Sequence, residues 1–170
     1  MRALMLGLFM NGLLPVLPGA SWADDWSHRL RIAEAIVAVT DDVEEQLTLA
    51  KIARYESAYR LDVADCRVKG SVGEVTAWQI LARSREERAS LCVSLEADAR
   101  LALARVREST RACRQLPREE RLAIYTRGSC SSAEGRKLSR HRTPGDRALR
   151  AFESMIANEP KQEESSAWNE

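Results

Sequence analysis

The sequence predicts a mainly α-helical fold for this chain of 170 residues, which is 45% apolar and 30% charged. Alanine, leucine, arginine and glutamate, all good helix formers, dominate the composition, and only 8 glycines and 5 prolines interrupt them. Apolar residues also recur at helical spacing in several segments. A chain of this length and apolar content buries one core, so we expect a single domain rather than an all-β or disordered protein.

The first 23 residues are typical of a secretory signal peptide. Residues 3–17 are mostly apolar, and Ser21 and Ala23 place small side chains at positions −3 and −1 of a cleavage site before Asp24. The apolar stretch is shorter than the ~20 residues of a membrane span, which favours cleavage over the alternative of an uncleaved anchor. We therefore expect an exported protein, periplasmic or extracellular in a bacterial source, without stable membrane insertion after cleavage.

Helical periodicity and capping residues divide the predicted domain, residues 24–157, into helices joined by one long loop. The polar residues 158–170 that follow are expected to form a disordered tail. Loss of periodicity, together with aspartates and glycines, predicts a loop over 61–75. The expected helices cover residues 26–39, 43–60, 84–113 with a break near 92–94, 117–128, and a last one that begins at 143–144.

The four cysteines, Cys66, Cys92, Cys113 and Cys130, form no C-x-x-C pair, and such pairs are usual in zinc sites. An even number of cysteines behind a signal peptide predicts two disulfides. Three pairings are possible. We favour Cys113–Cys130, because helix and turn signals between these residues indicate a chain that goes out and back; Cys66–Cys92 then remains. With only two histidines in the chain, we expect no metal and no cofactor.

Positive charge is concentrated in residues 81–150, which carry 17 basic and 9 acidic side chains, a net charge of +8. Residues 24–80 and 151–170 each carry a net charge of −4. The basic segment is either a set of ordinary solvated helix faces or a surface that attracts an anionic polymer. For an exported protein, a cell-wall polymer is the expected partner, rather than nucleic acid.

Glu56 is the residue that best fits catalytic chemistry. Leu49, Ile52 and Glu56 share one face of the predicted helix 43–60, so the carboxyl lies in line with apolar residues next to the predicted loop. Burial would raise the pKa of this carboxyl, and a carboxylic acid that keeps its proton near neutral pH acts as a general acid. The alternative is a glutamate at the rim of the core that reaches water.

Three segments in order strengthen that choice: residues 52–59 with Glu56-Ser57, residues 76–80 with Gln79-Ile80, and residues 123–130 with Tyr125. This order resembles the lysozyme-like lytic transglycosylases and their goose-type lysozyme relatives, over roughly residues 43–142. The resemblance implies a lysozyme-like helical domain with a long loop or short hairpin after the catalytic helix. It also implies a peptidoglycan-cleaving glycosidase that cuts the MurNAc-GlcNAc β-1,4 bond.

Carried onto this chain, the resemblance implies that Glu56 is the catalytic acid/base and that Ser57 orients it. It implies that Gln79 lies in the substrate cleft and that Tyr125 lies near the catalytic acid. The alternatives are a satisfied polar residue for Gln79 and a core residue for Tyr125. The chain departs from the family at Thr76 and Ala77, where glycine is usual two or three residues before the glutamine.

The family needs one carboxylate, because its glutamate first protonates the leaving oxygen and then deprotonates the C6 hydroxyl of the muramic sugar, which closes an anhydro ring. Asp62, Asp65 or Glu74 would be a second carboxylate if the enzyme instead hydrolyses the bond. The partner implied is the glycan strand of peptidoglycan, and we expect a monomer. The competing predictions are a non-catalytic cell-wall-binding module and a purely structural helical protein.

Overall fold

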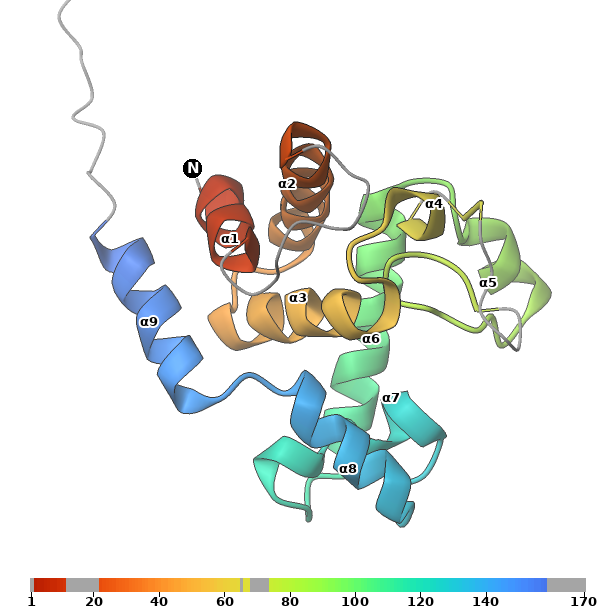
Figure 1. Cartoon of the computed structure of the whole chain (residues 1–170). Helices are drawn as coiled ribbons and strands as arrows, with labels where there is room; N and C mark the ends of the chain where they lie inside the picture. The colour runs from red at the N-terminus through yellow and green to blue at the C-terminus, as the bar shows by residue number, and fades with distance from the viewer. Residues whose placement is uncertain (1, 12–21, 65, 68–73, 159–170) are drawn as a thin grey trace, which may run out of the picture.

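The computed structural model describes residues 2–11, 22–64, 66–67 and 74–158, and this part of the chain is mainly helical (Figure 1). Its one pairing of extended backbone is an isolated antiparallel bridge between Val75 and Ile80. The elements are α1 (Arg2–Asn11), α2 (Trp22–Val39), α3 (Val43–Ser57), α4 (Leu61–Ala64), α5 (Arg85–Ser90), α6 (Leu95–Ala112), the 3-10 helix η1 (Arg118–Glu120), α7 (Ala123–Arg127), α8 (Ala133–Arg142) and α9 (Asp146–Ala157).

Helix α6 runs through the middle of the molecule and carries the other elements at its two ends (Figure 1). Helices α2 and α3 pack on it towards one end, and α7 packs on it towards the other. Helix α3 crosses α6 and also contacts α8. The C-terminal end of α3 is therefore close to elements that lie more than 60 residues later in the sequence.

Helix α3 has the caps that its sequence predicts. The Asp42 carboxylate accepts the backbone N–H of Glu45 at 2.9 Å, which satisfies one of the free donors of the first turn. The helix ends where Ala58 enters the left-handed region at φ 50° and donates its N–H to the carbonyl of Arg54. Leu49 and Ile52 are fully buried, as the predicted apolar face requires.

The predicted break in the region 84–113 is confirmed. Ser84 caps α5 by accepting the N–H of Glu87, and Ser94 caps α6 by accepting the N–H of Ala97. The chain between these helices includes Cys92, whose φ is 66°. Both predicted disulfides are present, Cys66–Cys92 and Cys113–Cys130. They are compatible with export to an oxidising compartment.

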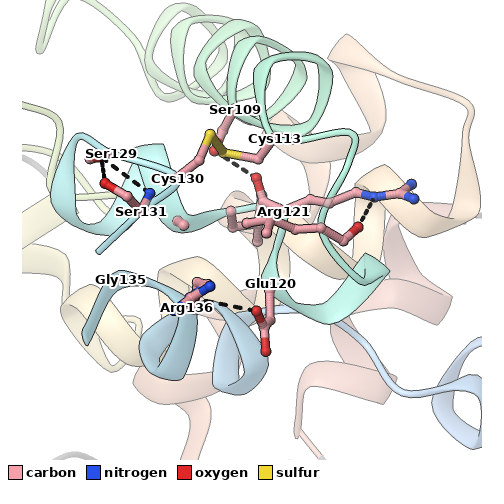
Figure 2. Close-up of a disulfide and its surroundings, with 12 residues drawn as sticks. Ser109, Cys113, Glu120, Arg121, Ser129, Cys130, Ser131, Gly135 and Arg136 are labelled. Carbon is pink, nitrogen blue, oxygen red and sulfur yellow. Dashed lines mark hydrogen bonds and ion pairs between the residues drawn. A yellow bond between two sulfur atoms is a disulfide. The ribbon is translucent and has the colours of Figure 1, made fainter. Parts of the chain in front are cut away.

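The sequence did not predict two helices, α4, which lies at the start of the predicted loop 61–75, and α8. Ser132 caps α8 by accepting the N–H of Gly135. Gly135 lies against α7 so closely that a Cβ there would be 2.9 Å from the carbonyl oxygen of Ala123. Figure 2 shows Gly135 near the Cys113–Cys130 disulfide, which joins the end of α6 to the segment before α8.

The predicted signal peptide contributes α1, which packs against α2 and α9. Leu6 and Met10 are fully buried, and the rings of Phe9 and Phe152 lie 5.4 Å apart. The predicted cleavage point after Ala23 falls in the first turn of α2, and cleavage there stays a prediction. No helix of the described ranges has the length and apolarity to cross a membrane. The predicted tail lies outside the described residues from position 159 onwards.

Candidate active site

A cavity of about 500 Å³ lies where the end of α3 meets the turn at 76–79, α7 and α8. Three of the four predicted functional residues, Glu56, Gln79 and Tyr125, line it although they come from separate segments of the sequence. The other lining residues are Glu74, Ile80, Leu81, Arg83, Arg105, Ile124, Thr126, Arg127, Gly128, Leu138 and Arg142. The structure therefore brings these three residues to one concave surface.

Glu56 is the last residue but one of α3, and its carboxylate forms an ion pair with Arg142 at the end of α8. The guanidinium Nε donates to Glu56 Oε1 at 2.7 Å, and Nη2 lies 2.5 Å from the same oxygen. The side chains are only 22% and 11% exposed, so the pair is largely removed from water. The partial burial expected for this carboxyl is present, but its cationic partner was not predicted, because the sequence did not predict α8, which supplies it.

Arg142 is itself held by its surroundings. Its Nη1 donates to the carbonyl of Leu138 at 3.2 Å, and its guanidinium carbon lies 5.7 Å from the centre of the Tyr55 ring. A cation over an aromatic face is attracted by the negative charge of that face. The guanidinium is therefore fixed by one carboxylate, one carbonyl and one ring.

Tyr125 lies close to this ion pair. Its hydroxyl donates to the carbonyl of Trp78 at 2.9 Å. Burial raises the pKa of the Tyr125 phenol, the negative charge of Glu56 raises this pKa further, and the positive charge of Arg142 opposes both effects. Tyr125 is consequently a neutral hydroxyl that ties α7 to the segment carrying Gln79.

Gln79 lies in a tight turn closed by two hydrogen bonds between the backbones of Val75 and Ile80, at 3.2 and 2.7 Å. Its side-chain amide donates to the carbonyl of Thr76 at 3.2 Å. Thr76 has φ 75° and Gln79 has φ 48°, both in the left-handed region. A β-branched residue is a genuine outlier there, so this turn stores strain at the cavity wall. Thr76 is one of the two positions, with Ala77, at which the resemblance implies glycine, and its backbone conformation is one that glycine favours.

Ser57, the fourth predicted residue, is not among the residues that line the cavity. It is buried, its hydroxyl donates to the carbonyl of Ala53 at 2.8 Å, and the same oxygen accepts the N–H of Tyr59 at 3.2 Å. These bonds hold the end of α3, which carries Glu56. Its role in orienting Glu56 stays a prediction, and any such effect here passes through the backbone.

The candidates for a second carboxylate lie in different places. Glu74 lines the cavity. The exposed Asp62 instead pairs with the Arg60 guanidinium, whose Nε donates to it at 3.0 Å. Asp65 lies outside the described residues. Of these three residues, only Glu74 is placed at the cavity by the structure.

Arginines are the residues of this site that sequence reasoning missed. Arg83, Arg105, Arg127 and Arg142 all line the cavity, against two carboxylates, Glu56 and Glu74. All four belong to the basic segment 81–150, so the concentration of charge was the available signal. Three of these arginines form ion pairs with carboxylates other than Glu56: Arg83 and Arg105 bind Glu108, and Arg127 binds Glu134.

A second cavity of about 400 Å³ lies between α3 and α6 and includes none of the predicted residues. Its charges neutralise one another, because Glu45 binds Arg107 at 2.7 Å and Glu44 binds Arg118 at 2.6 Å. The first of these pairs lowers the pKa of the Glu45 carboxyl, chiefly through the Arg107 hydrogen bond. Because the predicted residues Glu56, Gln79 and Tyr125 line the first cavity and not this one, we place the candidate site at the first cavity.

Within the described ranges, no three or more histidine, cysteine, aspartate or glutamate side chains gather as a metal site would require. The cavity offers polar side chains for a sugar and one ion-paired carboxylate for proton transfer. The arrangement itself is thus the evidence for function, since no protein-family model, curated protein sequence or solved structure matches this chain.

Proposed function

We propose that the protein is an exported peptidoglycan-cleaving glycosidase, a lytic transglycosylase in which Glu56 is the only catalytic acid/base. One observation carries the proposal: Glu56, Gln79 and Tyr125, selected from three separate segments of the sequence, line a single cavity. Glu56 and Gln79 are 23 positions apart, and Gln79 and Tyr125 are 46 positions apart, so nearness in the sequence does not explain why they share a cavity.

In this reaction Glu56 gives its proton to the glycosidic oxygen as the bond to C1 of the muramic sugar breaks. The carboxylate then removes the proton from the C6 hydroxyl, and that oxygen bonds to C1 to close the anhydro ring. The proton that the enzyme donated is thereby recovered, and no water is consumed. Gln79, at the wall of the cavity, has an amide that suits hydrogen bonds to sugar hydroxyl and acetamido groups.

Hydrolysis is the second candidate, because Glu74 also lines the cavity. A second carboxylate would activate a water molecule for attack at C1. The two reactions give different products: transglycosylation yields an anhydro sugar, and hydrolysis yields a reducing end that is heavier by one water. Mass analysis of fragments released from purified sacculi separates them, and a Glu74→Gln variant should lose activity only if the reaction is hydrolytic.

The test of Glu56 is the substitution Glu56→Gln. Glutamine keeps the shape of the side chain and an oxygen that accepts the Arg142 hydrogen bonds, but it has no proton to transfer. Because general acid–base catalysis contributes ~10²–10⁴-fold, we expect the rate of fragment release from sacculi to fall by at least ~10²-fold.

The matched control is Glu153→Gln, which makes the same chemical change at an exposed position of α9 and should leave the rate unchanged. Full activity of Glu56→Gln would show that this residue is not the acid. If the unmodified protein releases nothing but still sediments with sacculi, it is a non-catalytic cell-wall-binding module.

A further inference from the structure

Arg142 has a property that the proposed chemistry leaves unexplained. Its guanidinium makes a hydrogen bond and an ion-pair contact to the Glu56 carboxyl, yet the first step needs Glu56 to give up a proton. Both contacts end on the same oxygen, Oε1. The ion pair in this structure is therefore a resting state, and something must take the place of Glu56 on the guanidinium.

Simple opening of the pair would leave Arg142 without an anion. Its side chain is 11% exposed, and an unpaired charge in such a place is strongly unfavourable. The carbonyl of Leu138 and the ring of Tyr55 remain as contacts, but neither is an anion. Glu74, the other carboxylate that lines the cavity, has an interaction of its own. Of the glutamates nearby, Glu87 binds Arg105 at 2.7 Å and Glu108 binds Arg83 at 2.8 Å. The replacement anion must therefore come from outside the protein.

We propose that Arg142 binds a carboxylate of the substrate, one carried by the peptide attached to the muramic sugar, and that this carboxylate displaces Glu56 and so releases it for proton transfer. This inference rests on the proposed function and names the part of the substrate that the site requires. The guanidinium suits the task because its planar donors match a carboxylate with two parallel hydrogen bonds. Arg83 and Arg127, on the same cavity wall, add positive charge that attracts the anionic substrate.

Two consequences separate this role from a structural one. First, the enzyme should prefer glycan with free carboxylates over glycan whose carboxylates have been converted to neutral amides. Second, Glu56 and the substrate compete for the same guanidinium. Removing the Glu56 charge should therefore strengthen binding of the natural substrate, although it abolishes cleavage.

The experiment uses sacculi and a matched batch whose carboxylates are amidated with carbodiimide and ammonium ion. For the unmodified full chain, we expect fragment release to be about 10–100-fold faster from native sacculi, the range for losing a hydrogen bond between charged groups. In Arg142→Gln, only the part of this preference that comes from non-specific attraction of charge should remain. Arg142→Lys should keep more of the preference than Arg142→Gln does. Arg100→Gln is the control, because it removes the same charge from an exposed position of α6 outside the cavity and should keep the preference.

Co-sedimentation supplies the second measurement. Glu56→Gln should bind native sacculi more tightly than the unmodified protein does and bind amidated sacculi equally well. Equal release from both batches by an active enzyme would overturn the role of Arg142 and leave the proposed function intact. If no variant releases fragments, the proposed function fails. Sedimentation then still decides whether Arg142 binds the carboxylate, because a preference for native sacculi that Arg142→Gln abolishes supports it and any other result overturns it.

Discussion

The molecule has two halves, on either side of α6, that are held together by different forces. We call α2, α3 and residues 74–80 the apolar half: its fully buried side chains include Ile32, Ile36, Leu47, Ile52 and Trp78. We call η1, α7 and α8 the polar half. There Ser139, Glu120 and Arg142 are buried, a disulfide links the start and end of the segment 113–130, and few large apolar groups are present.

The difference shows how the candidate site is assembled. Glu56 and Gln79 come from the apolar half, whereas Tyr125 and Arg142 come from the polar half. Apolar packing is non-directional, while hydrogen bonds fix geometry to within a few tenths of an ångström. The acid therefore lies on a well-packed helix, and the residues that position its charge come from a hydrogen-bonded segment. The following predictions test this division.

The largest expected effect is on the apolar half, from Trp78→Ala. Trp78 is fully buried and its indole N–H donates to the carbonyl of Leu49 at 3.0 Å. The substitution creates a cavity and removes that hydrogen bond, so we expect the free energy of unfolding to fall by ~3–5 kcal/mol in urea titrations. Val93→Ala, at a side chain 72% exposed, should change it by less than ~0.5 kcal/mol. A loss below ~1 kcal/mol for Trp78→Ala would contradict an apolar half held by packing.

The disulfide of the polar half comes next. Replacing both Cys113 and Cys130 by serine opens a loop with a sequence separation of 17, which should lower the free energy of unfolding by ~3 kcal/mol. Because this half has few apolar contacts to compensate, hydrogen exchange should rise most in residues 114–142. The same double substitution at Cys66 and Cys92 is the matched control, and faster exchange in that same segment for the control would refute the division.

Ser139 tests the hydrogen bonds of the polar half directly. Its hydroxyl donates to the carbonyl of Glu119 at 2.7 Å and accepts the backbone N–H of Leu122 at 2.9 Å. Ser139→Ala leaves that N–H buried without a partner, and we expect a loss of ~2 kcal/mol in chemical unfolding. Ser131→Ala removes an exposed hydroxyl nearby and should be neutral within ~0.5 kcal/mol. Equal effects of the two substitutions would mean that the hydrogen bonds of Ser139 do not contribute to the free energy of unfolding.

The smallest effect concerns a buried charge at the start of α6. Asp98 is 1% exposed and accepts the Cys92 N–H at 3.0 Å. Burial raises the pKa of its carboxyl from 3.8 to about 6, with the Cys92 hydrogen bond acting in the opposite direction. The folded state therefore holds this proton more tightly than the unfolded state. That contribution to stability is complete below pH ~4 and is lost as the pH rises through about 6.

At pH 7.5 the buried charge thus costs stability, by at most ~3 kcal/mol for a pKa difference of about 2. Asp98→Asn removes the charge and keeps an acceptor for the Cys92 N–H. We expect a gain of ~1 kcal/mol at pH 7.5, since the buried amide needs partners of its own, and no gain at pH 4. Thermal unfolding at the two pH values measures this, and a gain that is the same at both would show that charge is not the cause.

The sequence predicted the helices whose capping residues and apolar periodicity lie within the helix itself or next to it. Asp42 before α3 and Ser84 before α5 are capping residues in the expected places, and the apolar positions of α3 are buried. Helix α8 escaped prediction because Leu138 is the only large apolar residue among its ten residues, so it shows no apolar periodicity. It is held instead by Ser132, Ser139 and the close approach of Gly135, which depend on tertiary contacts.

The residues of the candidate site were also predictable only in part. Glu56, Gln79 and Tyr125 were chosen from short segments, and all three reach the cavity. Arg142 was not chosen, because it lies 86 positions from Glu56 on a helix without apolar periodicity. The predicted loop 61–75 begins instead with helix α4, and part of it lies outside the described residues. The left-handed backbone at Thr76 could not be predicted, since threonine disfavours it.

The absence of a side chain at Gly135 affects the candidate site as far away as Glu56. A methyl group at this position would lie 2.9 Å from the Ala123 carbonyl and 3.2 Å from the Arg127 side chain, so α8 would have to tilt away from α7. Arg142 follows seven residues later, two turns along the same face of α8. A methyl group at position 135 would therefore displace the Arg142 guanidinium at the far end of α8. Glu56 would then lose its ion-pair partner, although none of the residues that line the cavity had been changed.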